Sequence, residues 1–180
     1  ESGLAEMLYS EGYRVTGSDS NESHAAQRLR LMDIPVSIGH HPEEIQGAAL
    51  VVYSAAIHEE DEERVEALRL NIPQMDRAVL LGQLMEGYRD TLCVCGTHGK
   101  TTTTAMTAQM LLGMGMDPTV HVGGRVDALG GSTRLGSQDI FVAEACEFNR
   151  SFLHMPPTIA ILLNIEEDHL DVYGDMEHVE

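Results

Sequence analysis

An apolar strand that runs into a short glycine loop and then a helix is the feature that most constrains this chain. Residues 91–95 read TLCVC, residues 96–104 read GTHGKTTTT, and a helical pattern continues to Leu112. Glycines let the backbone curl so that several N–H groups point at one phosphate, and a helix N-terminus adds positive potential. The pattern predicts a phosphate loop whose ATP-binding residues are Gly96, Thr97, His98, Gly99, Lys100, Thr101 and Thr102.

Two side chains of this loop have distinct predicted roles. Lys100 would reach the β- and γ-phosphates, and the Thr101 hydroxyl would ligate Mg²⁺. The commoner phosphate loop would need glycine at position 94, where this chain has Val94, so the loop is a shorter GxxGKT variant. The alternative is an ordinary glycine turn capped by threonines, but the strand before it and the helix after it favour the nucleotide site.

A second motif, VAEACE at residues 142–147, follows the apolar run that begins at Ile140. An acid just past a buried strand end is where a sheet of this kind presents a metal-ligating carboxylate. Glu144 is the better candidate because it follows the apolar run directly. Glu147 is the other acid of this motif, and it could equally be a solvated side chain. The same bland interpretation, a carboxylate that binds no metal, stays open for Glu144.

A third motif, NIEEDHLD at residues 164–171, follows the apolar run TIAILLNI. It should therefore lie at the same carboxyl edge of the sheet. A histidine among four acids in a hydrophilic turn is either a metal ligand or a surface residue. His169 is the candidate, and the sequence by itself leaves both interpretations open.

The periodicity along the chain predicts an α/β protein. Helical spacing is expected around Leu4–Leu8 and Ala25–Met32, across Glu59–Leu70 and through Ala78–Met85. Extended segments are expected at Tyr13–Thr16, Ala49–Tyr53, Thr91–Cys95, Ile140–Ala143 and Thr158–Ile165, with a glycine-punctuated stretch to about Gly136. Strands that are apolar along their whole length and alternate with helices favour parallel sheets covered on both faces. Gly87–Asp90 is the best domain boundary.

Charge and cysteine content restrict the partners and the setting. The net charge of -18 argues against a nucleic-acid partner, because binding a phosphate backbone needs a basic face. The three cysteines do not make a disulfide framework, and Cys93 and Cys95 fit small hydrophobic positions better than a zinc site with His98. No stretch approaches the roughly 20 apolar residues of a membrane span, and no signal peptide is visible. A cytoplasmic setting is expected.

The three motifs, in this order and at this spacing, resemble those of the Mur ligases. The first half agrees, since SGLAEMLYSEGYRVTGSD and VVYSAAI are similar to the UDP-sugar-binding domain of that family, and HVGGRVDALGGSTRLG is similar to a loop region between its ATP-site strands. The resemblance implies a Rossmann-like UDP-binding domain at residues 1–88. A P-loop-type ATP-binding domain with a mostly parallel sheet would follow at residues 89–180.

The function implied by the resemblance is ATP-dependent amide formation between L-alanine and UDP-N-acetylmuramate, with ATP and Mg²⁺ as cofactors. Lys100 would hold phosphate, Thr101 and Glu144 a first Mg²⁺, and His169 a second Mg²⁺ near the substrate carboxylate. Substrate contacts are expected from Ser54, Ala55, Gly123 and Gly124. The small Ser54–Ile57 segment follows an apolar strand at the carboxyl end where α/β sheets hold ligands, although a plain turn is the alternative there.

Departures from the family pattern leave other possibilities open. Many relatives have EADESD where this chain has EACEFN, so Cys146 and Asn149 replace acids while Glu144 is retained. The rivals are a recycling ligase that attaches a tripeptide to the same sugar nucleotide, a folate-type polyglutamate ligase and an inactive nucleotide-binding module. Both chain ends look cut, with the opening glycine-rich loop and an amino-acid-binding domain missing, so the 180 residues alone are not expected to catalyse ligation.

Overall fold

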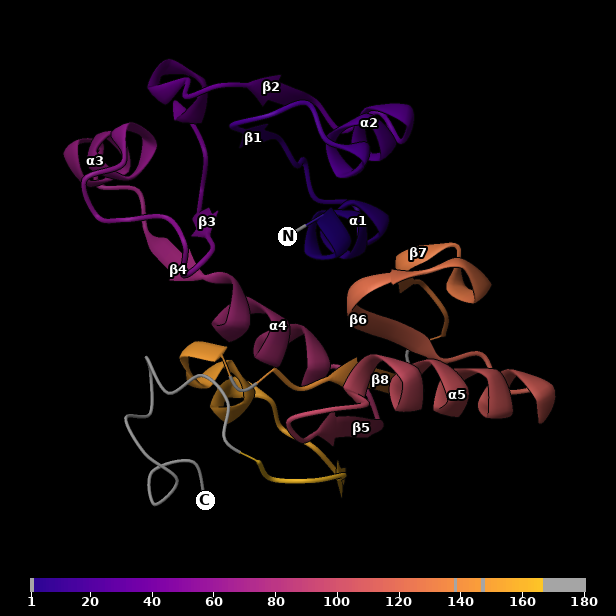
Figure 1. Cartoon of the computed structure of the whole chain (residues 1–180). Helices are drawn as coiled ribbons and strands as arrows, with labels where there is room; N and C mark the ends of the chain where they lie inside the picture. The colour runs from indigo at the N-terminus through magenta and orange to yellow at the C-terminus, as the bar shows by residue number, and fades with distance from the viewer. Residues whose placement is uncertain (1, 138, 147, 167–180) are drawn as a thin grey trace. The chain divides into compact units, whose positions relative to one another are not determined.

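Two compact units make up the protein in the computed structural model, which describes residues 2–137, 139–146 and 148–166 (Figure 1). The first unit ends at Leu80, so the division falls inside helix α4 (Arg77–Met85). The boundary predicted at Gly87–Asp90 lies further along the chain, between α4 and the next strand, and it stays a prediction.

Parallel strand pairs and helices alternate in the first unit. Its elements before α4 are α1 (Ser2–Ser10), β1 (Gly17–Asp19), α2 (His24–Leu31), β2 (Val36–Ile38), η1 (Pro42–Ile45), β3 (Val51–Tyr53), α3 (Glu62–Arg69) and β4 (Gln74–Asp76). β1 pairs with β2 and β3 pairs with β4, both in parallel. Parallel pairs need a crossover between their strands, and α2 and α3 provide it here. The predicted α/β class is confirmed.

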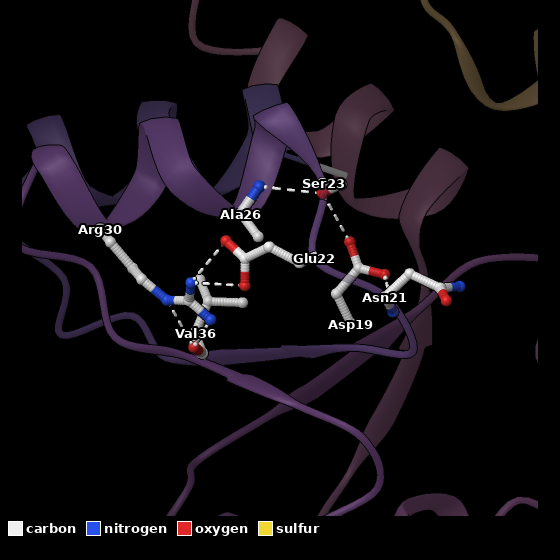
Figure 2. A network of polar contacts seen from close by, with 7 residues as sticks. All are labelled: Asp19, Asn21, Glu22, Ser23, Ala26, Arg30 and Val36. Atoms are coloured by element: carbon white, nitrogen blue, oxygen red, sulfur yellow. Dashed lines mark hydrogen bonds and ion pairs between the residues drawn. The ribbon is translucent and has the colours of Figure 1, made fainter.

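Helix α2 is capped at its N-terminus, where Ser23 also contacts Asp19 of β1, and is hydrogen-bonded to strand β2 near its C-terminus (Figure 2). The Ser23 hydroxyl accepts a hydrogen bond from the Ala26 N–H at 3.0 Å, which caps the helix N-terminus. Near the other end, the Arg30 guanidinium donates to the Val36 carbonyl at 2.9 and 2.7 Å and to Glu22 at 2.8 Å. A buried apolar cluster lies between them and contains Ala26, Leu29, Ile34 and Val36.

The strand predicted at Tyr13–Thr16 is misplaced by a few residues. These residues are irregular in the structure, and β1 begins at Gly17, opposite Val36. Tyr13 is 60% exposed, so its side chain lies at the surface. The ladder with β2 determines where the strand forms, and that partner is not visible in a local pattern.

A five-stranded sheet organises the second unit, in the order β7-β6-β8-β5-β9. Its elements are β5 (Asp90–Cys95), α5 (Lys100–Gly113), β6 (Thr119–Val126), η2 (Asp127–Leu129), β7 (Gly131–Arg134), β8 (Ile140–Glu144), η3 (Phe148–His154) and β9 (Ile159–Leu162). β5 pairs in parallel with both β8 and β9, and β6 pairs in parallel with β8. The carboxyl ends of these four strands therefore meet at one edge of the sheet.

Helix α5 packs on this sheet through a small apolar cluster. Ala108 is fully buried against Val120, Val122 and Val142, and Leu129 closes the cluster. The helix predicted to follow the glycine loop is thus confirmed, and its burial fixes the loop that precedes it. Because α5 contacts both β6 and β8, its first residues lie beside the ends of those strands.

The glycine-punctuated stretch contains structure that the sequence did not predict. β6 and β7 form an antiparallel hairpin at the edge of the sheet, joined through the η2 turn. Gly130 ends that turn with a φ of 74°, a left-handed conformation that glycine adopts without a steric penalty. The glycines that indicated a loop therefore belong partly to a strand and partly to a turn.

Candidate functional site

The loop between β5 and α5 has a backbone shape that requires glycine at two positions. Gly96 has a φ of 131° and Gly99, the N-cap of α5, a φ of 85°. A Cβ on Gly96 would lie 2.9 Å from the Asn164 carbonyl oxygen and 3.0 Å from its nitrogen. The loop therefore packs directly against the backbone that follows β9, and a side chain at position 96 would push the two apart.

The Lys100 ammonium folds back over this loop. It donates to the carbonyls of Gly96 at 2.7 Å and of Thr97 at 3.0 Å. Lys100 is also the first residue of α5, where the helix N-terminus contributes positive potential. The charge predicted to meet the β- and γ-phosphates thus lies at the loop, next to backbone donors.

Thr101 and Glu144 come together although 43 residues separate them. The Thr101 hydroxyl donates to Oε2 of Glu144 at 2.8 Å. The Gly123 N–H donates to the same oxygen at 2.9 Å, so β6, β8 and α5 all contribute to this point. Hydroxyl and carboxylate oxygens are the ligands that Mg²⁺ prefers, and the two oxygens predicted as its ligands are adjacent here. The pair fits a Mg²⁺ site, to which water and phosphate oxygens would add the other ligands.

Glu144 and Glu147 were the two candidate carboxylates for the metal site, and the structure describes the position of Glu144. Glu144 is the last residue of β8 and is half-buried at the sheet edge. Glu147 lies outside the described residues, as does His169, so the proposed role of His169 stays a prediction. In the part of the chain that the structure describes, no group of three or more His, Cys, Asp or Glu side chains could hold a metal ion.

The segment after β9 packs against the loop between β5 and α5, and Asn164 makes most of its hydrogen bonds to that loop. The His98 N–H donates to the Asn164 side-chain oxygen at 2.8 Å, and the Asn164 amide donates to the His98 carbonyl at 3.0 Å. Sequence reasoning named this motif for His169 and missed Asn164. The available signal was a polar side chain directly after an apolar strand that ends at the same sheet edge.

A shallow groove of about 550 Å³ runs beside the first turns of α5. Its lining includes Thr101, Met106 and Met110 of α5 and Arg125 of β6. A ligand at the Thr101–Glu144 pair therefore has open space beside it. Gly124, one of the predicted substrate contacts, is exposed close by in sequence, and a Cβ there would meet no atom within 4 Å.

The predicted substrate residues of the first unit lie in a locally bonded turn. Ser54 directly follows β3, and its hydroxyl accepts from the Ala56 N–H at 3.3 Å. The Ile57 N–H donates to the Ser54 carbonyl at 2.9 Å, and Ala55 is exposed. The segment is therefore accessible at the carboxyl end of a strand, and its contacts with substrate stay a prediction.

The cysteines of β5 fit the sheet better than a metal site. Cys93 is 3% exposed, and burial raises the pKa of its thiol to about 11. Because only the thiolate binds zinc well, this burial disfavours Cys93 as a ligand. The Cys95 thiol donates to the Ile161 carbonyl at 3.4 Å and so faces β9. These contacts support the interpretation of both residues as small packed side chains.

Two family models match almost the whole chain. The model described as Mur ligase family, catalytic domain, matches residues 2–89, and the model described as Mur ligase middle domain matches residues 94–180. Curated relatives include the UDP-N-acetylmuramate–L-alanine ligases of Acetivibrio thermocellus, 49% identical, and Clostridium beijerinckii, 47% identical. Each alignment covers 99% of this chain but only 38% and 39% of the respective relative.

Solved structures agree with these matches. A UDP-N-acetylmuramate-alanine ligase from Thermotoga maritima superposes with a TM-score of 0.91 at 31% identity, over 99% of this chain and 42% of that one. A UDP-N-acetylmuramate:L-alanyl-γ-D-glutamyl-meso-diaminopimelate ligase from Neisseria meningitides gives 0.89 at 28% identity, over 99% of this chain and 61% of that one. The chain thus spans well under half the length of the curated relatives that it matches.

Proposed function

The chain belongs to the Mur ligase family, and from this premise we propose that the complete protein is an ATP-dependent ligase that joins L-alanine to UDP-N-acetylmuramate in peptidoglycan synthesis. The observation that carries the ATP-dependent chemistry is the meeting of Thr101 and Glu144 beside the Lys100 loop. The choice of substrates is supported by curated relatives of that name, 49% and 47% identical over 99% of this chain.

The proposed reaction needs ATP because a carboxylate is a poor electrophile. The lactyl carboxylate of the sugar nucleotide attacks the γ-phosphorus of ATP, ADP leaves, and an acyl phosphate forms. The neutral amine of alanine then attacks the acyl carbon, the C–O bond to phosphate breaks, and the nitrogen loses a proton. One ATP is thereby converted to ADP and phosphate for each amide formed.

The described residues suit the first of these steps. Phosphoryl transfer is catalysed mainly by positioning and by neutralising charge. The Lys100 ammonium and the N-terminus of α5 would hold the phosphates and stabilise the charge that develops on them. Mg²⁺ bound by Thr101 and Glu144 would supply further neutralisation between two anions that repel each other. The family resemblance adds His169 as a ligand of a second Mg²⁺.

The sugar nucleotide is assigned to the first unit. Support comes from Ser54 and Ala55, which lie at the exposed carboxyl end of β3. Gly123 and Gly124, next to Glu144, are the proposed contacts in the second unit, since neither carries a side chain that would block a substrate.

A cytoplasmic site for this reaction remains our expectation. Among the helices of the described residues, none is long and apolar enough to cross a membrane. The substrates are charged nucleotides and an amino acid, so the reaction as proposed would take place in water.

Phosphate release by the complete protein tests the function. With UDP-N-acetylmuramate, Mg²⁺ and ATP present, adding L-alanine should produce one phosphate per amide, and omitting the sugar nucleotide should abolish release. The tripeptide L-alanyl-γ-D-glutamyl-meso-diaminopimelate is the competing amine. Release with the tripeptide and not with alanine would establish a recycling ligase, and release with neither amine would contradict the proposal.

A further inference from the structure

We propose that Asn164 is a positioning residue of the phosphate loop: its carboxamide forms hydrogen bonds with both the backbone N–H and the backbone carbonyl of His98, and so directs which backbone N–H groups face the nucleotide. This inference rests on the proposed ATP site. In our proposal, the phosphate loop contacts the phosphates of ATP, and Asn164 acts on that loop without contacting the phosphates itself.

Both the oxygen and the nitrogen of the Asn164 carboxamide form hydrogen bonds with the backbone of His98. The Asn164 side-chain oxygen accepts from the His98 N–H at 2.8 Å, and its nitrogen donates to the His98 carbonyl at 3.0 Å. The side chain thus satisfies the donor and the acceptor of a residue 66 positions away. An asparagine amide has both a donor and an acceptor group, whereas an ionised aspartate can only accept and an alanine can do neither.

Further hydrogen bonds around Asn164 join the phosphate loop to the segment that follows β9. The Leu163 N–H donates to the Cys95 carbonyl at 3.0 Å, and the Thr97 N–H donates to the Asn164 carbonyl at 3.2 Å. The Glu166 N–H then donates to the Thr97 hydroxyl at 2.9 Å. Because a side chain at Gly96 would clash with this backbone, the contact tolerates little displacement.

This arrangement divides the N–H groups of the loop into two sets. Those of Thr97 and His98 point to the segment after β9, where Asn164 accepts both of them. The N–H groups of Thr101 and Thr102, at the N-terminus of α5, would be the donors directed to phosphate. Without the carboxamide, the two peptide groups on either side of His98 lose these hydrogen bonds and can rotate, so the backbone that leads into α5 is no longer held in one direction.

The test compares Asn164→Ala and Asn164→Asp with the wild type in the complete protein. We expect the KM for ATP to rise about tenfold in Asn164→Ala, which loses both hydrogen bonds, and by a smaller factor in Asn164→Asp, which keeps an acceptor for the His98 N–H. The KM values for UDP-N-acetylmuramate and alanine should change less than twofold. Asn21→Ala and Asn21→Asp are the matched controls for the KM for ATP, because Asn21 lies in the first unit, outside the proposed ATP site, and its amide donates to the neighbouring Ser20 at 3.0 Å.

A second readout follows the loop itself. In Asn164→Ala without ligand, amide hydrogens in a peptide spanning residues 96–100 should exchange with deuterium at least several-fold faster, because the protected His98 N–H is released. A purely structural role would lower the melting temperature of the variants while leaving both the KM for ATP and this exchange unchanged. That result overturns the proposal.

The function and the inference can fail separately. If the wild type releases no phosphate with alanine, the proposed function fails, and calorimetric titration with Mg·ATP decides the role of Asn164 instead. About tenfold weaker binding in Asn164→Ala supports the positioning role. Equal binding by variant and wild type overturns it.

Discussion

The two units differ in the hydrogen bonds that form at the carboxyl ends of their strands. In the first unit, the turn after β1 is bonded within itself, with the Asn21 N–H donating to Asp19 at 3.1 Å, and the turn after β3 is closed by Ser54 in the same way. In the second unit, the bonds after the strands join distant segments, as between Thr101 and Glu144.

This difference follows from the sheets. Four strands of the second unit lie side by side with their carboxyl ends at one edge, so the loops after them are forced into contact. The described sheets of the first unit have two strands each. Their ends are hydrogen-bonded within their own turns and also to helix α3, where the Glu63 carboxylate accepts from the Ser18 hydroxyl at 2.7 Å and from the His41 N–H at 3.0 Å. The second unit differs in the chemistry that its strand ends bring together, because a hydroxyl, a carboxylate and an ammonium group lie at one edge of its sheet. The turn after β3 in the first unit offers small, accessible side chains instead. We therefore place the chemistry in the second unit and nucleotide recognition in the first.

Removal of the Lys100 charge should produce the largest effect. Lys100→Ala in the complete protein is expected to lower kcat/KM by about 10²–10³, because a preorganised charge at the phosphates is lost. Lys100 is the only lysine among the 180 residues, so no neighbouring lysine of this chain can replace it. The assay is alanine-dependent phosphate release, with Arg89→Ala as a control for loss of positive charge, because Arg89 is exposed and lies before β5, at the end of that strand away from the loop. Activity above about a tenth of the wild type would refute the assignment of the loop.

Gly96→Ala should damage the loop by geometry and not by charge. Its φ of 131° is strained for alanine, and the new Cβ would lie 2.9 Å from the Asn164 carbonyl oxygen. We expect a loss of about 1–3 kcal/mol in unfolding free energy together with weaker ATP binding. Chemical denaturation of the complete protein measures the first quantity. Gly113→Ala, at the end of α5 with no atom within 4 Å of its Cβ, is the control and should be close to neutral.

Glu144→Gln should separate metal binding from nucleotide binding. The amide keeps an acceptor for the Gly123 N–H but loses the charge that would attract Mg²⁺. The Mg²⁺ concentration at half-maximal activity is expected to rise about tenfold, with a smaller change in the KM for ATP measured at saturating Mg²⁺. Asp127→Asn, an 88% exposed carboxylate paired with Arg125, provides the control. An unchanged Mg²⁺ titration would remove Glu144 from the metal site.

Ser54→Ala should have the smallest effect, and it tests the first unit. The hydroxyl makes one weak local bond, so its removal should cost little stability. If Ser54 contacts the sugar nucleotide, the KM for UDP-N-acetylmuramate should rise about threefold to tenfold, while the KM for ATP stays constant. Steady-state kinetics with each substrate varied in turn gives both values. A change confined to the KM for ATP would show that the ATP site has been assigned to the wrong unit.

Local patterns predicted those parts of the molecule whose shape is determined locally. The strand, glycine loop and helix around Gly96 were predicted with nearly the observed bounds, because each part has its own backbone requirement. The β6–β7 hairpin was missed, since its glycines indicate a turn without indicating its strand partners. Asn164 was missed for a related reason. Its role depends on β9 lying next to β5, a neighbour that only the fold reveals.

Hydrogen–deuterium exchange of the complete protein, with Mg·ATP and with UDP-N-acetylmuramate added separately, tests the division of labour most directly. Mg·ATP should slow exchange in residues 96–104 and around Glu144, where the loop and the metal pair lie. UDP-N-acetylmuramate should slow exchange in the first unit, including residues 54–57. Protection by Mg·ATP that is confined to the first unit, or by the sugar nucleotide that is confined to residues 96–104, would contradict the assignment of chemistry and recognition to separate units.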